Sequence, residues 1–366
     1  MYFKNKFKNK KVAVIGHTGF KGSWLTAWLN QLGAEVAGFS KDIPTTPSHF
    51  ELAHLDQNIL DVRGNIVNYN EILKFLTDFK PDILFHMGAN AIVSDCLEHP
   101  QDAFLTNSFG TVNVLEAIRH TPSLKSVVIV TSDKCYENIE WEFGYRENDR
   151  LGGKDPYSAS KACAEIIFSS YFRTYLQFMP HLSIATARAG NVIGGGDWAA
   201  NRIIPDCIRS WTKSESVQIR NPEATRPWQH VLEPLSGYLL LASELLEGVE
   251  GLNGESFNIG PKAEVNKAVS ALIEEMQHHW KNVKVDIDKS HHLNKKEASL
   301  LKLCCDKALN RLGWMPTLTF NETVEMTALW YRNWHEIPVS VKEFTDLQIK
   351  SYGDFASKRG MVWTKN

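Results

Sequence analysis

Short apolar runs alternate with longer amphipathic segments between residue 11 and about residue 194. Runs of this length, bounded by glycine, proline or polar residues, are typical of strands buried on both faces of a sheet. The sequence predicts such strands at 11–15, 34–40, 81–89, 125–132 and 182–194.

The segments between these runs carry apolar residues at helical spacing, which predicts helices at 23–33, 69–79, 106–120 and 155–175. Strands that alternate with helices in this way pair in parallel, with helices on both faces of the sheet. We therefore expect an α/β fold with a Rossmann-type, doubly wound parallel sheet.

The pattern changes after about residue 195, where a glycine-rich stretch is followed by irregular segments rich in tryptophan and proline. A further helix at 233–246 is expected to return to the first domain. We expect a dinucleotide-binding domain at 1–190 and a smaller, mostly helical substrate domain at 191–366. The two interleave, because the chain returns to the first around 228–260.

Composition narrows the class of protein. The chain has 366 residues, 43% of them hydrophobic and 22% charged, and a formal net charge of -2. This balance gives no reason to expect a nucleic acid or an anionic membrane as partner. No apolar stretch approaches the roughly 20 residues of a membrane span, and no secretory signal is recognisable. We expect a cytoplasmic protein, free thiols at all six cysteines and no metal site, because no cysteine spacing suits zinc.

Gly16, Gly19 and Gly22 form GxxGxxG between the first strand and the first helix. Glycines at this position let the backbone approach a pyrophosphate, which the helix N-terminus favours, so the loop predicts a dinucleotide site. The second strand ends in Ser40 and Lys41 instead of an acidic residue, and this feature alone leaves NADP open. Asp61 is either an adenine contact or a turn-forming residue.

Tyr157 and Lys161 are four residues apart on a predicted helix and therefore share a face. A tyrosine has a pKa of about 10, and a nearby ammonium can lower it by about two or three units. The resulting phenolate would take a proton from a sugar hydroxyl. Ser132, at the end of the strand 125–132, would hydrogen-bond the same hydroxyl.

These motifs together resemble the extended short-chain dehydrogenase/reductase family. "GHTGFKGSWL", "TSDKCYEN", "GGKDPYSASK", "RAGNVIGGGDW" and "RPWQHVLEPLSGYLLLA" resemble one branch of it, the CDP-glucose 4,6-dehydratases. The resemblance implies a lyase that oxidises C4 of a nucleotide-linked hexose, expels the 6-hydroxyl as water and returns the hydride to C6. It also implies bound NAD, a nucleotide-sugar substrate and a homodimer paired through the helices near 104–119 and around Tyr157.

The resemblance assigns roles residue by residue. Ser132, Tyr157 and Lys161 serve the oxidation, and Asp133 is the acid for the departing hydroxyl. Lys134 stands where related dTDP-glucose dehydratases carry a glutamate base, and it is expected to act as base, enolate stabiliser or positioning group. The expected NAD contacts are Gly16, Thr18, Gly19, Phe20, Gly22, Ser40, Asp61, Val62, Ala89, Asn107, Tyr157 and Lys161. The expected substrate contacts are Asn191, Arg202, Arg226, His230 and Glu297.

The loop at 88–97 departs from the family pattern, since it reads "GANAIVSDCL" where the family has "AAQPLVRxSY". The other motifs still predict the type of reaction, whereas this departure leaves open which hexose the substrate carries. A nucleotide-sugar epimerase or reductase is the alternative, because it shares Ser132, Tyr157 and Lys161 without needing the acid at Asp133. A non-catalytic NAD-binding scaffold is the third hypothesis, and the intact Tyr157–Lys161 pair argues against it.

Overall fold

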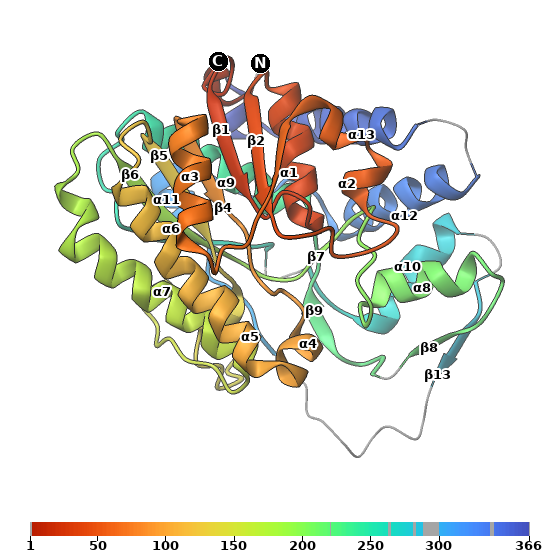
Figure 1. Cartoon of the computed structure of the whole chain (residues 1–366). Helices are drawn as coiled ribbons and strands as arrows, with labels where there is room; N and C mark the ends of the chain where they lie inside the picture. Colours follow the sequence, from red (N-terminus) through yellow and green to blue (C-terminus); the bar gives the residue numbers. More distant parts are fainter. Residues whose placement is uncertain are drawn as a thin grey trace.

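A computed structural model describes residues 2–219, 221–262, 265–280, 283–287, 300–336 and 340–365. Its centre is a seven-stranded sheet with the order β11-β6-β5-β4-β1-β2-β3, in which every pair is parallel (Figure 1). The strands are β1 (Lys11–Ile15), β2 (Glu35–Ser40), β3 (Leu60–Arg63), β4 (Ile83–His86), β5 (Ser126–Val130), β6 (Ser183–Ala189) and β11 (Ser256–Ile259). The predicted Rossmann-type fold is confirmed.

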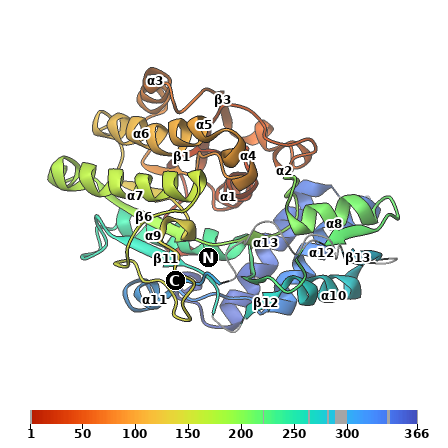
Figure 2. The same ribbon diagram turned by 90° about the horizontal axis from the view of Figure 1, so that it is seen from below.

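Helices cover both faces of this sheet (Figure 2). α3 (Tyr69–Phe79), α6 (Gly110–Arg119) and α7 (Pro156–Thr174) lie on one face. α1 (Phe20–Gln31) and α9 (Leu232–Leu246) lie on the other, where α13 (Val341–Lys358) packs against α1. Alternate strand residues serve the two cores: Val12 and Val14 belong to one, Ala13 and Ile15 to the other. Residues 12–15 of β1 are therefore apolar without interruption.

A second group of elements lies beside the sheet, on the right in Figure 1. Its helices are α8 (Ile203–Trp211), α10 (Val269–His279) and α12 (Phe320–Glu336). Three short strand pairs complete it: β8 (Val217–Ile219) with β13 (Val285–Ile287), β9 (Thr225–Pro227) with β12 (Asn266–Ala268), and β7 (Val192–Ile193) with β10 (Gln229–His230). The remaining helices are α2 (His49–Leu52), α4 (Val93–Glu98), α5 (Pro100–Phe104) and α11 (Asp306–Leu312).

Two expected elements are broken in the structure. The helix predicted at 106–120 begins with a π-helical turn, Leu105–Phe109, before α6. The strand predicted at 182–194 ends at Ala189, and β7 follows in a different sheet. Asp61 lies within β3, paired with Gly38, so it is not a turn-forming residue. π-helical turns and strand breaks often mark functional sites, because they redirect side chains.

The order of the strands determines where a ligand can bind. In the sheet, β2 and β3 lie on one side of β1, and β4, β5 and β6 lie on the other. The order of the strands therefore reverses at β1. Ligands bind at the carboxyl ends of strands next to such a switch point. Along this edge lie the glycine loop after β1, Thr131 after β5 and Gly190 after β6.

Two findings bear on the cysteines and on membranes. All six cysteines are free thiols, as expected. Within the described part of the chain, no helix combines the length and the apolar character that crossing a membrane requires.

Candidate active site

The three glycines of the first loop have different reasons to be glycine. Gly16 has φ +90°, and a Cβ on it would lie 2.7 Å from the Gly88 nitrogen. A Cβ on Gly22 would lie 2.0 Å from the Gly16 oxygen. A Cβ on Gly19 would meet only the Gly16 oxygen, at 3.4 Å. The chain itself therefore requires the outer two, whereas Gly19 opens onto free space at the start of α1, whose N-terminus has no side-chain cap. An uncapped helix N-terminus beside open space fits a dinucleotide pyrophosphate.

His17, in the glycine loop, connects this loop to β2 and β3. Its Nδ1 lies 2.9 Å from Ser40 Oγ, and its Nε2 lies 2.9 Å from Asp61 Oδ1. Burial lowers the pKa of His17, against the opposing effect of Asp61. Ser40 and Asp61, both expected to contact the cofactor, are thus brought to the loop through His17, a residue that the motif did not single out. Arg63 Nη2 donates to the other Asp61 oxygen at 2.6 Å.

The other expected cofactor residues lie around this loop. Thr18 is buried and donates to the Asp42 carbonyl at 2.7 Å, while Phe20 begins α1. Asn107, in the π-helical turn, accepts from the Asn90 backbone nitrogen at 2.8 Å and donates to Ser160 Oγ at 2.9 Å. These hydrogen bonds attach Asn107 to the loop that contains Ala89. Its side-chain amide is therefore already bonded within the protein and is not free to bind a ligand. Val62 is half-buried on β3.

The turn at residues 131–134, which contains the expected catalytic residues Ser132, Asp133 and Lys134, follows β5 directly, and we call it the catalytic turn. Ser132 Oγ donates to Asp133 Oδ1 at 3.0 Å and accepts from the Lys134 backbone nitrogen at 3.2 Å. Asp133 is 6% exposed, and burial raises its pKa despite the nearby Lys134. Lys134 Nζ lies 5.9 Å from the centre of the Tyr157 ring. The turn therefore presents a protonatable acid and an amine toward the tyrosine.

Tyr157 and Lys161 lie on the first turns of α7, which begins with Asp155 as cap and Pro156 in the first position. Burial raises the pKa of Tyr157 to about 12, although a hydrogen bond with Ser132 opposes this shift. Burial also lowers the pKa of Lys161 to about 8. We expected Lys161 to lower the pKa of Tyr157. In the structure burial outweighs that effect, and the cation that acts on the phenol is Arg202.

Lys21 is a site residue that the sequence reasoning missed. It lies in the first turn of α1, and burial lowers its pKa to about 8, with Asp133 opposing and Arg202 and Lys161 reinforcing the shift. Lys21 stands between Phe20 and Gly22 of the glycine motif, and a pattern search limited to glycines passes over it. Lys21 brings one more cation to the space that Asp133 faces.

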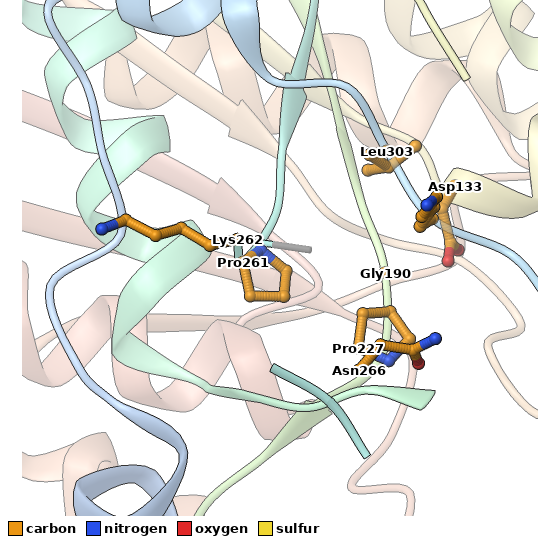
Figure 3. A pocket seen from close by; sticks show the side chains of 8 residues that line it. Asp133, Gly190, Pro227, Pro261, Lys262, Asn266 and Leu303 are labelled. Carbon is orange, nitrogen blue, oxygen red and sulfur yellow. The ribbon is translucent and has the colours of Figure 1, made fainter. Parts of the chain in front are cut away.

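A pocket opens beside Asp133 at the edge between the sheet and the second group of elements. Its walls include Asp133, Gly190, Pro227, Pro261, Asn266 and Leu303. In Figure 3 the Asp133 carboxyl points into the space between Leu303 and Pro227, whereas Lys262 extends away from it. A Cβ on Gly190 would lie 2.8 Å from Asp133 Oδ2, so a side chain at Gly190 would collide with the acid.

The expected substrate residues are not all brought to this pocket. Arg202 Nη1 forms an ion pair with Asp197 Oδ2 at 2.8 Å, near Tyr157. Asn191 is exposed next to Gly190, and Arg226 precedes Pro227 on β9. His230, in contrast, is fully buried with its ring edge-on to Trp24 at 5.9 Å, so we correct its assignment from substrate contact to core packing. Glu297 lies outside the described residues.

Comparison with known proteins identifies relatives over most of the chain. The family model described as GDP-mannose 4,6 dehydratase matches residues 13–327. CDP-glucose 4,6-dehydratase of Salmonella typhimurium is 44% identical over 340 residues, covering 91% of this chain and 94% of the relative. dTDP-glucose 4,6-dehydratase of Haemophilus influenzae is 25% identical over 342 residues, covering 87% and 97%.

Solved structures share the fold. The dTDP-glucose 4,6-dehydratase of Bacillus anthracis in complex with NAD superposes with a TM-score of 0.72 at 22% identity, covering 88% of this chain and 97% of the other. The UDP-glucose 4-epimerase of Thermotoga maritima with UDP-glucose gives 0.74 at 22% identity, covering 89% and 100%. The family model matches most of this chain, and one relative is 44% identical to it over 340 residues. The chain therefore belongs to the GDP-mannose 4,6 dehydratase family.

Proposed function

We propose that this chain is a nucleotide-sugar 4,6-dehydratase that converts CDP-glucose to CDP-4-keto-6-deoxyglucose with bound NAD. The observation that carries the proposal is Asp133, a buried acid with a raised pKa beside Ser132 and Tyr157, pointing into a pocket. An oxidation at C4 alone needs no such acid, whereas the loss of a hydroxyl as water does.

Oxidation of C4 requires removal of the hydroxyl proton. Tyr157 is the base, and Ser132, which lies beside the phenol, would bond the sugar hydroxyl. The glycine loop with Gly16, Gly19 and Gly22 would hold NAD, which would supply the hydride chemistry of the reaction. Because burial makes the phenolate costly, Tyr157 needs a nearby cation to act as base, and Arg202 is the cation that lowers its pKa in the structure.

Loss of water follows from the acidity of the C5 proton next to the new ketone. Asp133, whose pKa burial raises, gives its proton to the departing 6-hydroxyl, which leaves as water. Lys134 faces the same space from the catalytic turn. We assign it to the C5 side of the sugar, where a neutral amine would take the proton and an ammonium would stabilise the enolate.

The cations near Asp133 suit a substrate with a diphosphate. Lys21, Lys161 and Arg202 lie close to one another, and the carboxylates beside them are Asp133, Asp197, which pairs with Arg202, and Glu165 next to Lys161. A guanidinium can bind two phosphate oxygens at once. The cytidine and glucose parts of the proposal rest on the relative from Salmonella typhimurium, which bears the name CDP-glucose 4,6-dehydratase.

We further propose a homodimer, in the cytoplasm, paired through what we call the α5–α7 face. This face presents Phe104, Leu105, Phe109 and Ile166, which are 39%, 46%, 50% and 56% exposed. They lie on α5, the π-helical turn and α7, beside a shallow groove also lined by Val112 and Ile167. Apolar side chains gathered in this way usually mark an interface, and a second copy buries the same residues on both sides.

The experiment that tests the function is incubation of the purified protein with CDP-glucose and NAD, with the product read by mass spectrometry. We expect a product lighter by one water. A nucleotide-sugar epimerase is the second candidate, since such an enzyme uses Ser132, Tyr157 and Lys161 as well. An unchanged mass with new stereochemistry at C4 would favour it and contradict the dehydratase. No product from any nucleotide sugar would favour a non-catalytic protein.

A further inference from the structure

Glu165 is a buried charge that the proposed reaction does not use. It lies on α7 one turn after Lys161, and its side chain is 1% exposed. Arg188 on β6 pairs with it, Nη2 to Oε2 at 2.7 Å, and is itself 3% exposed. Burial opposes ionisation of Glu165, but Arg188 and the hydrogen bonds around it outweigh burial and lower its pKa. The carboxylate is therefore charged, inside the protein and close to the catalytic lysine.

The carboxylate joins α7 to three neighbouring strands, β5, β6 and β11. Thr131 Oγ1, just after β5, donates to Oε1. Thr186 Oγ1 on β6 donates to Oε2 at 3.0 Å, and Ser256 Oγ on β11 donates to the same oxygen at 3.1 Å. Of these three hydroxyl residues, Thr131 alone belongs to the catalytic turn, immediately before Ser132 and Asp133.

The same network reaches the wall of the pocket. Arg188 Nη1 donates to the Tyr136 hydroxyl at 2.8 Å, and that hydroxyl donates to Asn258 Oδ1 at 2.7 Å. Asn258 Nδ2 donates to the Cys304 carbonyl at 3.0 Å, next to Leu303, which lines the pocket. Helix, catalytic turn and pocket wall are thus connected through hydrogen bonds buried in the protein.

Stability is a weak reason for such an arrangement. Replacing a buried ion pair by apolar residues is often neutral or stabilising, because the desolvation of two charges offsets their attraction. A fixed geometry is a better reason, since directed hydrogen bonds determine where Thr131 lies and apolar packing does so less strictly. Catalysis is sensitive to such placement: a displacement of about 1 Å can cost a factor of about 10² in rate.

We propose that Thr131 and Glu165 form a positioning pair, which holds the catalytic turn with Ser132 and Asp133 in register with Tyr157 and Lys161 on α7. This inference rests on the proposed function. Thr131 acts through its neighbours and does not touch the substrate.

The chain supplies a matched control. Thr131→Val and Thr186→Val each remove one hydroxyl donor from the Glu165 carboxylate with little change in shape. We expect Thr131→Val to lower kcat about tenfold with KM within about twofold, and Thr186→Val to leave both nearly unchanged. Thr131→Ser, which keeps the hydroxyl, should restore most of the turnover. Urea unfolding of the two valine variants should show similar losses of stability.

Equal losses of kcat in the two valine variants would overturn the inference, as would normal turnover in Thr131→Val. A second measurement does not depend on the substrate: amide hydrogen exchange of the segment 131–135 should accelerate in Thr131→Val and not in Thr186→Val. If the wild-type protein makes no product from CDP-glucose, the proposed function fails. The exchange measurement then still decides the positioning role, and unchanged exchange in Thr131→Val contradicts it.

Discussion

Asp133, Tyr157 and Lys161 carry titratable groups that are between 6% and 9% exposed. For each of them, burial is the largest cause of its pKa shift, and in each case it favours the neutral form. A neutral aspartic acid can donate a proton, and a neutral phenol next to cations can lose one when substrate arrives. At the scale of the residue, exclusion of water thus shifts the pKa values of these groups so that they can transfer protons.

Two substitutions separate the steps assigned to Tyr157 and Asp133. Tyr157→Phe should slow the oxidation by a factor of about 10²–10⁴, so reduced cofactor should not form. Asp133→Asn should slow the loss of water by a similar factor and let bound reduced cofactor accumulate, visible in its absorbance after substrate is added. Both proteins should fold. Accumulation of reduced cofactor in Tyr157→Phe, or its absence in both variants, contradicts the assignment.

Lys161 should cost stability as well as serve catalysis. Its pKa falls from 10.5 to about 8 on folding, so the folded protein binds fewer protons than the unfolded chain between those pH values. Stability therefore rises with pH across that window and is lowest below it, by about 3 kcal/mol at most. Lys161→Met should raise the free energy of unfolding of the cofactor-free protein at pH 7, as measured in urea.

The gain in Lys161→Met should shrink as the pH rises from about 8 and vanish above about 10.5, where the wild-type lysine becomes neutral in the unfolded chain as well. Lys154→Met is the control, because Lys154 is exposed and should show no such gain. A loss of stability in Lys161→Met at pH 7 would contradict the role of burial.

At the scale of elements, two glycines of the same loop are expected to have different roles. Gly22 is required by the fold, and Gly19 is required for binding of NAD. Gly22→Ala should destabilise the protein itself, because the new Cβ would lie 2.0 Å from the Gly16 oxygen. Gly19→Ala should leave the unfolding of the cofactor-free protein unchanged, since its Cβ reaches only 3.4 Å from that oxygen. It should still weaken NAD binding about tenfold or more, by filling space near the helix N-terminus.

Calorimetric titration with NAD and urea unfolding without it measure the two effects. Normal NAD affinity in Gly19→Ala would mean that the pyrophosphate of NAD does not bind beside Gly19. An equal loss of stability in both variants would mean that the space beside Gly19 serves the fold and not a ligand.

The elements were predictable wherever local pattern and tertiary structure agree. β1, α3 and α7 match the sequence-based expectation to within one residue at each end, because their apolar residues face cores that the pattern already implies. The π-helical turn before α6 and the break after β6 were not predictable, since both depend on contacts with distant segments. Ser132, Asp133, Tyr157 and Lys161 are brought together as expected. The pairing of His17 with Asp61 and the burial of His230 depend on distances across the fold that no spacing encodes.

At the scale of the whole molecule, the α5–α7 face is the surface that a monomer would leave uncovered. Phe109→Lys should place a charge in the proposed interface and shift the protein from dimer to monomer, as measured by sedimentation equilibrium. Phe178→Lys is the control, since Phe178 is 72% exposed and lies after α7, outside this face. A wild-type monomer, or a dimer that both variants retain, would contradict the proposed pairing.

The central claim is that one site oxidises C4, removes water across C5 and C6, and returns the same hydride to C6. CDP-glucose that carries deuterium at C4 tests all three steps in one reaction. We expect a product lighter by one water, with the deuterium located at C6 by mass spectrometry and nuclear magnetic resonance. A product of unchanged mass that retains deuterium at C4 would contradict the account and identify an epimerase.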